Sequence, residues 1–480
     1  MRTSIARRPG SRTGSPEGFD RRLLAPMILG SVLNPVNSSI IAVALVPIGA
    51  AFGAPPAQTA WLVSALYLAT AIGQPVVGRL VDLYGPRRLF LAGTSLTGIA
   101  GLVGVLAPDL GVLVVARVLL GFGTCAGYPA AMSLIRREAE RTGRDSPAGV
   151  LTALAVAGQT IAVVGPTLGG LLIGLGGWRT TFALNIPLAA TALILGVLRL
   201  PRTPRPERRP GDRPVAGLDL PGMALFAATL ISLLLFLMDP RAAHWYLPVL
   251  TAGAATGFAI RERRLEEPFI DLRVLGGNLP LLATYGRTLL AYVVSYAFLY
   301  GYTQWLEQGR GLSPSEAGLL QLPLFLTGIL ISSTTGRRKE IRGKLLVGAA
   351  GQIAACAILP ALHSHSAIWL LIAVALVFGI PQGLNSLALQ NAVYHQADPA
   401  RTASSAGLLR TFVYLGAMVA SAANGVFFSR RADTTGLHHL AWFMLAIAVL
   451  FLAVTVADRS LRRIGTARPA VSDTREVDHP

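Results

Sequence analysis

Three arginines lie inside long apolar runs of this sequence, where a charged side chain has to find either a partner or water. They are Arg117, Arg287 and Arg410. If the runs cross a membrane, an arginine there costs about 3 kcal/mol or more unless it faces protein or a water-filled cavity. Arg117 therefore has two interpretations: it donates hydrogen bonds to carbonyl groups of neighbouring helices, or it contacts a substrate or a proton relay. Uncompensated arginines around a cavity would favour anionic or zwitterionic ligands over lipophilic cations.

Amide and phenol side chains form a second set of groups in these runs that can bind a ligand. With the arginines they make up the predicted polar lining of a central cavity: Asn34, Asn37 and Gln159 in the first half, and Tyr292, Tyr296, Gln321, Gln382 and Asn385 in the second. For each of them singly, a hydrogen bond between helices is the alternative to ligand contact. The set predicts a polar centre within an apolar protein.

The elements that position these groups are apolar segments of nearly uniform length. Hydrophobic residues make up 52% of the 480-residue chain, charged residues make up 14%, and the mean hydropathy is +0.56. A soluble protein has about 25% charged residues. Segments of about 17–25 apolar residues match a hydrocarbon core of about 30 Å, and this length indicates helices rather than a barrel. We predict fourteen spans: 24–48, 57–77, 88–107, 111–135, 148–174, 180–199, 218–238, 244–260, 280–305, 314–334, 344–362, 367–390, 403–428 and 436–457.

The net charge of +18 does not indicate a nucleic-acid partner, because the basic residues alternate along the chain. They precede the first span and follow the second, fourth, sixth, eighth, tenth and last spans, whereas the connections 49–56 and 108–110 have none. This positive-inside pattern predicts a bacterial inner-membrane protein with both termini in the cytoplasm and with attraction to anionic lipid. The connection 429–435 is discordant, since it carries Arg430 and Arg431 on the predicted outer side.

Two polar segments, 200–217 and 261–279, divide the chain and enclose an additional pair of spans. Removing that pair leaves six spans on each side, as in carriers built from two related halves. The predicted organisation is a cytoplasmic tail (1–23), a six-helix bundle (24–199), a linker (200–217), an inserted helix pair (218–260), a linker (261–279), a second six-helix bundle (280–457) and a cytoplasmic tail (458–480).

Two stretches of the first half combine glycine with charge or proline at fixed spacing. The stretch from Gly78 to Arg88 indicates a short charged loop between the second and third spans, with Asp82 near a helix N-terminus. Small residues at three- and four-residue spacing in the fifth span predict close helix packing with a proline kink. The residues of this second motif are Gly158, Gly165, Pro166, Gly169 and Gly170.

Both motifs resemble those of transporters of the major facilitator superfamily (MFS). The first resembles G-x-L-x-D-x-x-G-R-[RK], and the second is similar to G-x-x-x-G-P-x-x-G-G of MFS exporters. Residues 177–187 resemble the G-W-R-x-x-F-x-x-N-x-P run of fourteen-span drug:proton antiporters, and Trp61, Tyr67 and residues 313–318 extend the resemblance over nearly the whole chain. The matching positions of the first motif are Gly78, Leu80, Asp82, Gly85, Arg87 and Arg88, with Pro86 departing.

This resemblance implies an all-α integral membrane protein of the MFS fold with 14 transmembrane helices. It also implies export of a drug, antibiotic or metabolite in exchange for protons, by alternating access. In the family the first motif holds the cytoplasmic gate, which here would be formed by Asp82, Arg87 and Arg88.

The first span departs from the family pattern where a titratable group is expected. The family reads D-x-T-I-V-N-V-A-L-P, whereas the run here begins with Asn37, which cannot titrate. No Asp or Glu lies at the centre of any predicted span, although a proton antiporter needs a group that changes charge near its site. Three routes stay open: coupling through Asp82 or Glu307 at the mouths, protonation of the substrate itself, or transport without proton coupling.

The sequence has no catalytic or cofactor signature. It lacks the Gly-Lys-Ser/Thr loop that cradles phosphate, so we expect no enzyme, no cofactor and no direct use of ATP. His363 and His365 lack a third ligand, and Cys125 and Cys356 lie in apolar spans, so neither a metal site nor a disulfide is expected. The expected partners are a small-molecule substrate, protons and lipid, with the chain acting as a monomer. Two alternatives are an uncoupled facilitator or importer of a small anionic solute, and a non-transporting sensor or scaffold.

Overall fold

The computed structural model describes residues 20–142, 148–202, 219–265, 277–335, 340–397, 402–458 and 460–462, and the regular elements within them are all helices. The predicted tails and linkers lie largely outside these ranges. The N-terminal group of helices comprises η1 (Arg21–Leu23), α1 (Leu24–Ile40), η2 (Ile41–Val43), α2 (Leu45–Phe52), α3 (Pro56–Tyr84), α4 (Pro86–Leu106), α5 (Leu110–Thr124), α6 (Gly127–Thr142), α7 (Ala148–Gly176), α8 (Arg179–Ala183) and α9 (Asn185–Arg199).

A hairpin and a second group of helices follow. The hairpin comprises α10 (Leu220–Met238), η3 (Ala242–His244) and α11 (Tyr246–Arg264). The C-terminal group comprises α13 (Leu279–Gln308), α14 (Pro314–Thr335), α15 (Ile341–Ile358), η4 (Leu359–Ala361), α16 (Ile368–Gln396), α17 (Thr402–Phe427), α18 (Thr434–Ala457) and η6 (Ser460–Arg462).

Every predicted span falls on one helix or on consecutive helices, but not every one of these helices meets the criteria for crossing a membrane. Ten segments of the described chain are long and apolar enough, by length and composition. Four predicted spans, at α7, α11, α13 and α17, are not among the ten. Two of these helices carry a charged residue within the apolar run, Arg287 in α13 and Arg410 in α17, which lowers their hydropathy. The chain is therefore a multi-span helical protein, and ten of the fourteen predicted spans meet these criteria.

The predicted loop from Gly78 to Arg88 is not a loop. Helix α3 continues to Tyr84, and α4 begins at Pro86, so the whole turn is Gly85. Gly85 has φ 88°, a left-handed conformation that glycine adopts without steric cost, and Pro86 at the first helical position suits its fixed φ. Asp82 consequently lies in α3, and its side chain is outside the described part of the structure.

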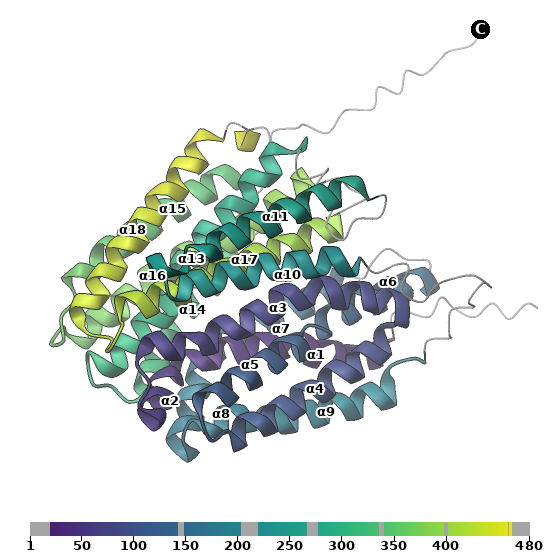
Figure 1. Cartoon of the computed structure of the whole chain (residues 1–480), viewed down its shortest axis with the longest axis horizontal. Coiled ribbons are helices and arrows are strands. Elements are labelled where there is room, and N and C mark those ends of the chain that lie inside the picture. Colours follow the sequence, from purple (N-terminus) through teal and green to yellow (C-terminus); the bar gives the residue numbers. More distant parts are fainter. Residues whose placement is uncertain are drawn as a thin grey trace, which may run out of the picture.

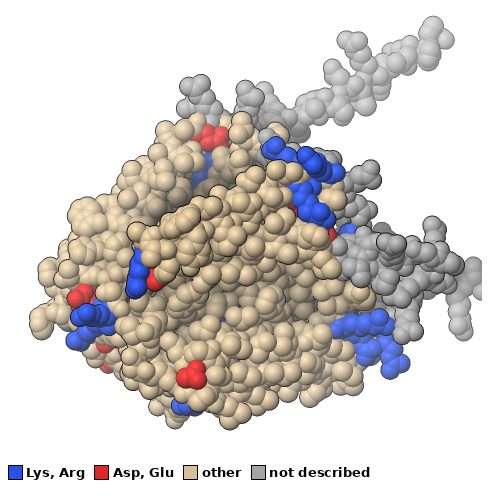
Figure 2. All heavy atoms as spheres, in the orientation of Figure 1, with Lys and Arg blue, Asp and Glu red and all other residues tan. Residues whose placement is uncertain are grey.

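The two groups of helices lie side by side, with the hairpin across one of the seams between them (Figure 1). The groups meet along two helix pairs, α3 with α17 and α7 with α14, and α10 packs on both α3 and α17. A hydrophobic core joins all three parts, because it includes Leu66 of α3, Leu234 of α10 and Met418 of α17. Charged side chains visible in Figure 2 gather toward the ends of the helices and leave a broad uncharged belt between them.

Candidate functional site

The two groups of helices are tightly joined at one end, which we call the closed end. It contains the start of α3, the end of α17, the second half of α7 and the start of α14. In the first pair, the Ser421 hydroxyl donates to the carbonyl of Ala60 at 2.8 Å. In the second pair, Ser315 donates to the carbonyl of Gly170 at 2.8 Å and Thr167 to that of Gly318 at 3.1 Å. Hydrogen bonds from side chain to backbone across the seam require that the helices nearly touch.

The glycine motif of α7 makes this approach possible. A Cβ atom on Gly170 would lie 2.5 Å from the carbonyl oxygen of Pro314, and one on Gly318 would lie 2.6 Å from that of Pro166. Gly165 and Gly169 face α1 and η2 instead, where an added Cβ would collide with Ser39 and with Val43 respectively. The motif therefore packs α7 against both α1 and α14, as small residues do between membrane helices.

At the opposite end, which we call the open end, three glycines of these helices have no such close neighbour. Added Cβ atoms on Gly78 of α3, Gly158 of α7 and Gly407 of α17 would meet no atom within 4 Å. These three positions therefore border free space toward the end that contains Gly85. We take the region between the two groups of helices at this end as the candidate site and call it the vestibule.

Arg410 of α17 lies in this vestibule. Its side chain is exposed although it is eight residues inside the helix, and its guanidinium carbon lies 4.6 Å from the centre of the Tyr128 ring of α6. It also hydrogen-bonds Tyr414 one turn further in, and the Tyr414 hydroxyl accepts from Gln74 of α3 at 3.3 Å. A cation from the C-terminal group thus meets an aromatic ring of the N-terminal group in the geometry of a cation–π contact.

Beyond Arg410 the vestibule ends in a cluster of phenol rings. The hydroxyls of Tyr67 and Tyr300 lie 3.0 Å apart, and Tyr300 donates to the carbonyl of Ser38 at 3.1 Å. Ring centres of Tyr67 are 5.4 Å from Tyr296 and 5.6 Å from Tyr414, distances typical of favourable aromatic pairs. We call the set the tyrosine cluster; its members are Tyr67, Tyr128, Tyr292, Tyr296, Tyr300 and Tyr414.

The tyrosine cluster combines predicted and unpredicted residues. Tyr292 and Tyr296 were candidates, and both are half-buried on one face of α13. Tyr128, Tyr300 and Tyr414 were not. The four-residue spacing of 292, 296 and 300 was the available signal, because residues at this spacing share one helix face.

Arg117 is buried and is satisfied by backbone groups. Its Nε donates to the carbonyl of Leu62 at 2.8 Å and its Nη1 to that of Asn37 at 3.0 Å, while Nη2 has no partner in the described chain. In this conformation the contacts fit the interpretation in which Arg117 donates hydrogen bonds to carbonyl groups of neighbouring helices, and not the one in which it contacts a substrate.

Asn37 forms a reciprocal amide pair with Asn185 of α9. The Asn37 amide donates to Asn185 Oδ1 at 2.6 Å, and Asn185 donates back to Asn37 Oδ1 at 3.0 Å. Both residues are buried. Asn185 was quoted only as part of a motif and not as a candidate, although an amide at the start of an apolar helix was a usable signal. Asn34 lies one turn away and donates to the Thr124 hydroxyl at 3.0 Å.

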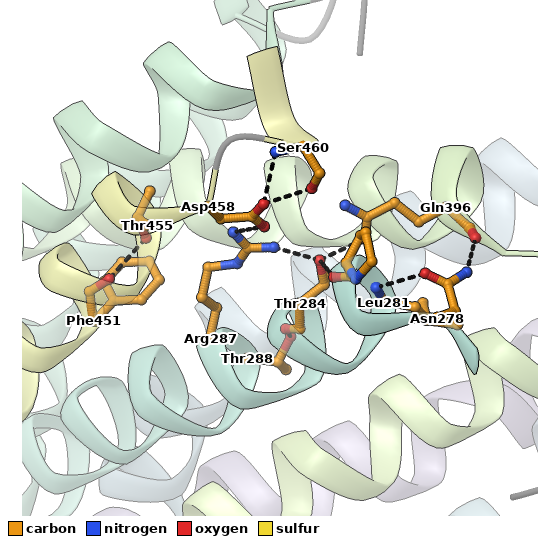
Figure 3. A network of polar contacts seen from close by, with 11 residues as sticks. Asn278, Leu281, Thr284, Arg287, Thr288, Gln396, Phe451, Thr455, Asp458 and Ser460 are labelled. Atoms are coloured by element: carbon orange, nitrogen blue, oxygen red, sulfur yellow. Dashed lines mark hydrogen bonds and ion pairs between the residues drawn. The ribbon is translucent and has the colours of Figure 1, made fainter. Parts of the chain in front are cut away.

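Arg287 corrects the expectation of three uncompensated arginines. It forms an ion pair with Asp458, with Nη1 to Oδ2 at 2.8 Å, and its Nη2 donates to Thr284 at 2.6 Å (Figure 3). The pair joins the first turns of α13 to the end of α18, within the C-terminal group. Sequence could not show this, because Asp458 follows the last span and only folding brings it beside α13.

The carboxylate of Asp458 is held in its charged form. Burial alone would raise the pKa of this group, but hydrogen bonds from Ser460 and the neighbouring Arg287 lower the pKa below its ordinary value. Arg287 thus belongs to a neutralised contact and not to the vestibule.

The other candidate residues have separate surroundings. Gln321 donates to the Thr303 hydroxyl at 2.7 Å, and Asn385 is buried with no hydrogen-bond partner in the described chain. Gln382 is half-buried near Gly328, and the Gln159 side chain lies outside the description. Their contact with a substrate stays a prediction.

The first motif is only partly described. Arg87 donates to the carbonyl of Val197 in α9 at 2.9 Å, whereas Arg88 is exposed. Its gating role stays a prediction. Among the described residues no group of three metal-ligating side chains occurs.

Known proteins are similar in sequence to this chain over most of its length. The sequence model of the Major Facilitator Superfamily matches residues 27–421. The chain is 30% identical over 444 residues to the uncharacterized MFS-type transporter YwoD of Bacillus subtilis (strain 168), covering 90% of this chain and 96% of that protein. It is 31% identical over 401 residues to the lincomycin resistance protein of Streptomyces lincolnensis, covering 80% and 79%.

Further similarity is found at lower coverage and in the fold. The chain is 29% identical over 337 residues to the tetracenomycin C resistance and export protein of Streptomyces glaucescens, covering 68% of this chain and 60% of that protein. Among solved structures, a mutant of the nucleoside transporter NupG has a TM-score of 0.63 at 12% identity, covering 90% of this chain and 100% of that one. This last likeness concerns the fold alone.

Proposed function

The chain belongs to the Major Facilitator Superfamily, and from this premise we propose that it exports a small drug, antibiotic or metabolite in exchange for protons. It is a multi-pass membrane protein and a transporter rather than an enzyme. In the proposal it crosses the bacterial plasma membrane fourteen times, as two six-helix bundles with an inserted helix pair, and keeps both termini in the cytoplasm. It acts as a monomer on a small-molecule substrate.

The vestibule is the observation that carries this proposal. It lies between the two groups of helices and contains Arg410 and the tyrosine cluster, and in this proposal it opens at one end only, because α7 and α14 touch at Gly170 and Gly318 at the other end. A central site that opens to one side at a time is what alternating access requires. The open end is then the cytoplasmic one, and Asp82, Arg87 and Arg88 act at its rim as a gate.

The direction of transport rests on the relatives. Two of them carry names that state resistance, and one of these also states export. A chain with a vestibule accessible from the cytoplasm and such relatives is best explained as an exporter that loads its substrate from inside the cell.

Arg410 and the tyrosine cluster define the substrate chemistry of the proposal. An exposed guanidinium donates charge-assisted hydrogen bonds to a carboxylate or a similar anion, and phenol rings provide apolar faces for an aromatic ring. The preferred substrate therefore carries an aromatic body and an anionic or zwitterionic group. Since Arg287 is neutralised by Asp458, this preference now depends on Arg410.

The uncoupled facilitator is the second candidate, and the Asn37–Asn185 pair favours it. The position where the family has a titratable group holds a neutral amide whose hydrogen bonds are made within the protein. A carrier without another proton site would move its substrate down its gradient.

Flux in proteoliposomes tests the proposal. Purified protein is reconstituted with an imposed pH gradient, and a panel of aromatic carboxylates, zwitterions and quaternary ammonium dyes is added, with Asn37→Asp alongside. We expect substrate-dependent proton movement in the unmodified protein. Flux without proton movement would establish the facilitator, and absence of flux for the whole panel, with Asn37→Asp equally silent, would contradict transport of these compound classes.

A further inference from the structure

We propose that Glu307 is a proton-binding site of the closed end, and that closing this end takes up one proton from the extracellular side. The inference rests on the alternating-access function proposed above. It concerns a residue that has no part in the vestibule.

Glu307 is a buried carboxyl group without a partner. It lies in the last turn of α13, its exposed fraction is 7%, and neither of its carboxyl oxygens has a hydrogen-bond partner in the described chain. The comparable acid Glu138 is also buried, but it forms an ion pair with Arg141 at 2.7 Å. An ionised carboxylate buried without a partner is strongly unfavourable, and the group becomes neutral by binding a proton instead.

The position of Glu307 on α13 places it at the seam between the two groups of helices. Residues seven apart share a helix face, and Tyr300, seven residues earlier, donates across the seam to the carbonyl of Ser38. Helix α13 also packs against η2 and α2 of the N-terminal group. Separation of this seam, as alternating access requires, would expose Glu307 to water, where the carboxylate is stable.

Other charged and titratable groups around α13 have partners or lie elsewhere. Glu316 of α14 accepts from Ser313, Arg431 donates to the carbonyl of Gln308, and Asp433 accepts from the amide of Gly436. Elements η2 and α2 contain no titratable residue. Arg310, three residues after Glu307, donates to the carbonyl of Ser364. The remaining titratable groups on the packed elements and their connections are Tyr394, His395, Arg410, Tyr414, Arg430, His438 and His439.

No charged neighbour therefore replaces the proton on Glu307. Burial disfavours the charged form of this carboxyl group, and no opposite charge lies beside it to compensate. By linkage, a conformation that binds one more proton than its alternative gains about tenfold in relative population for each unit by which pH falls. The closed end should thus be favoured by external acid.

A pair of labels across the closed end provides the test. Spin labels at Ala51→Cys and Ser429→Cys, both exposed sites at that end, report the separation of the two groups of helices in full-length protein in nanodiscs. As pH rises from 5 to 9, we expect the ratio of separated to closed molecules in the unmodified protein to increase by up to about tenfold per pH unit. Glu307→Gln, which resembles the protonated acid, should hold the short distance throughout.

The matched control is Glu316→Gln, which removes an acid at the same end whose hydrogen bonds lie within its own first turn. It should respond to pH as the unmodified protein does. A flat response in the unmodified protein, an unchanged response in Glu307→Gln, or a lost response in Glu316→Gln would each overturn the proposal.

Proton counting covers the case in which Glu307→Gln does not fold. Cross-linking Ala51→Cys to Ser429→Cys with a bismaleimide, an addition that moves each thiol proton to carbon and releases none, should take up one proton per molecule in weakly buffered solution, and no uptake would overturn the proposal. The pH response requires no substrate. Substrate flux without this response would contradict the Glu307 site only, whereas the response without flux would contradict the transport function and leave the site standing.

Discussion

The closed end and the open end are built from the same four helices, α3, α7, α14 and α17, but from different kinds of residue. At the closed end, backbones meet through Gly170, Gly318, Ala57 and Gly425. Toward the open end the same helices present an arginine, phenol rings and glycines that touch nothing. Small residues make the contact that holds the conformation, and large polar residues make the surface that receives a ligand.

The largest expected effect concerns the glycines of these two ends. Gly318→Ala places a methyl group 2.6 Å from the carbonyl oxygen of Pro166, and such overpacking costs about 1–3 kcal/mol. The ratio of closed to separated molecules should fall by about 5- to 150-fold, measured by the label pair at Ala51 and Ser429.

The control for that change is Gly407→Ala at the open end, where the added methyl group has free space. Alanine is about 1 kcal/mol better than glycine inside a helix, so this variant should keep the distance distribution and gain thermal stability. An equal response of both variants would show that the ends do not differ in packing.

The next effect compares two arginines of the C-terminal group. Arg410→Gln should weaken binding of an aromatic carboxylate by about 10- to 100-fold, because a hydrogen bond to a charged group is worth about 1.5–3 kcal/mol. Arg287→Met should leave the affinity of folded molecules unchanged, since Arg287 faces Asp458 and not the vestibule. Equilibrium binding to purified protein measures both, and a larger loss in Arg287→Met would refute this assignment of the site.

The smallest effect is a pH dependence of stability at the end of α18. The pKa of Asp458 is lowered in the folded protein, so its contribution is present above the ordinary aspartate pKa of about 3.9 and is lost as pH falls through the folded value. For this partly buried pair we expect about 1–2 kcal/mol. Asp458→Asn should therefore unfold at a lower temperature at pH 7, and the difference from the unmodified protein should shrink below pH 4.

Sequence periodicity predicted the helices well because a bilayer imposes one length on all of them. Each predicted span falls on one helix or on consecutive helices. Of the four α7 glycines predicted to pack closely, Gly165, Gly169 and Gly170 do so, whereas Gly158 borders free space. The turn at Gly85 was misplaced because the apolar run gives no sign that α3 continues through Arg79 and Asp82 to Tyr84.

The site was harder to predict because it depends on which helices become neighbours. Arg287 and Arg410 look alike in sequence, as single arginines within apolar runs. Folding brings Asp458 to the first and Tyr128 to the second, and these partners are 171 and 282 residues away along the chain. The pairing of Asn37 with Asn185 could likewise not be predicted, because the two residues are 148 positions apart in the sequence.

The placement of α10 has a consequence for compounds that dissolve in lipid. Because α10 packs on α3 and α17, it shields that side of the vestibule from the acyl chains, whereas the other seam is formed by α7 and α14 themselves. In the orientation proposed above, an amphipathic molecule diffusing in the inner leaflet therefore meets two unequal flanks. Its lateral route to Arg410 runs past α7 and α14, and bulky substitutions on the lipid-facing surface there should slow the uptake of hydrophobic substrates more than that of water-soluble ones.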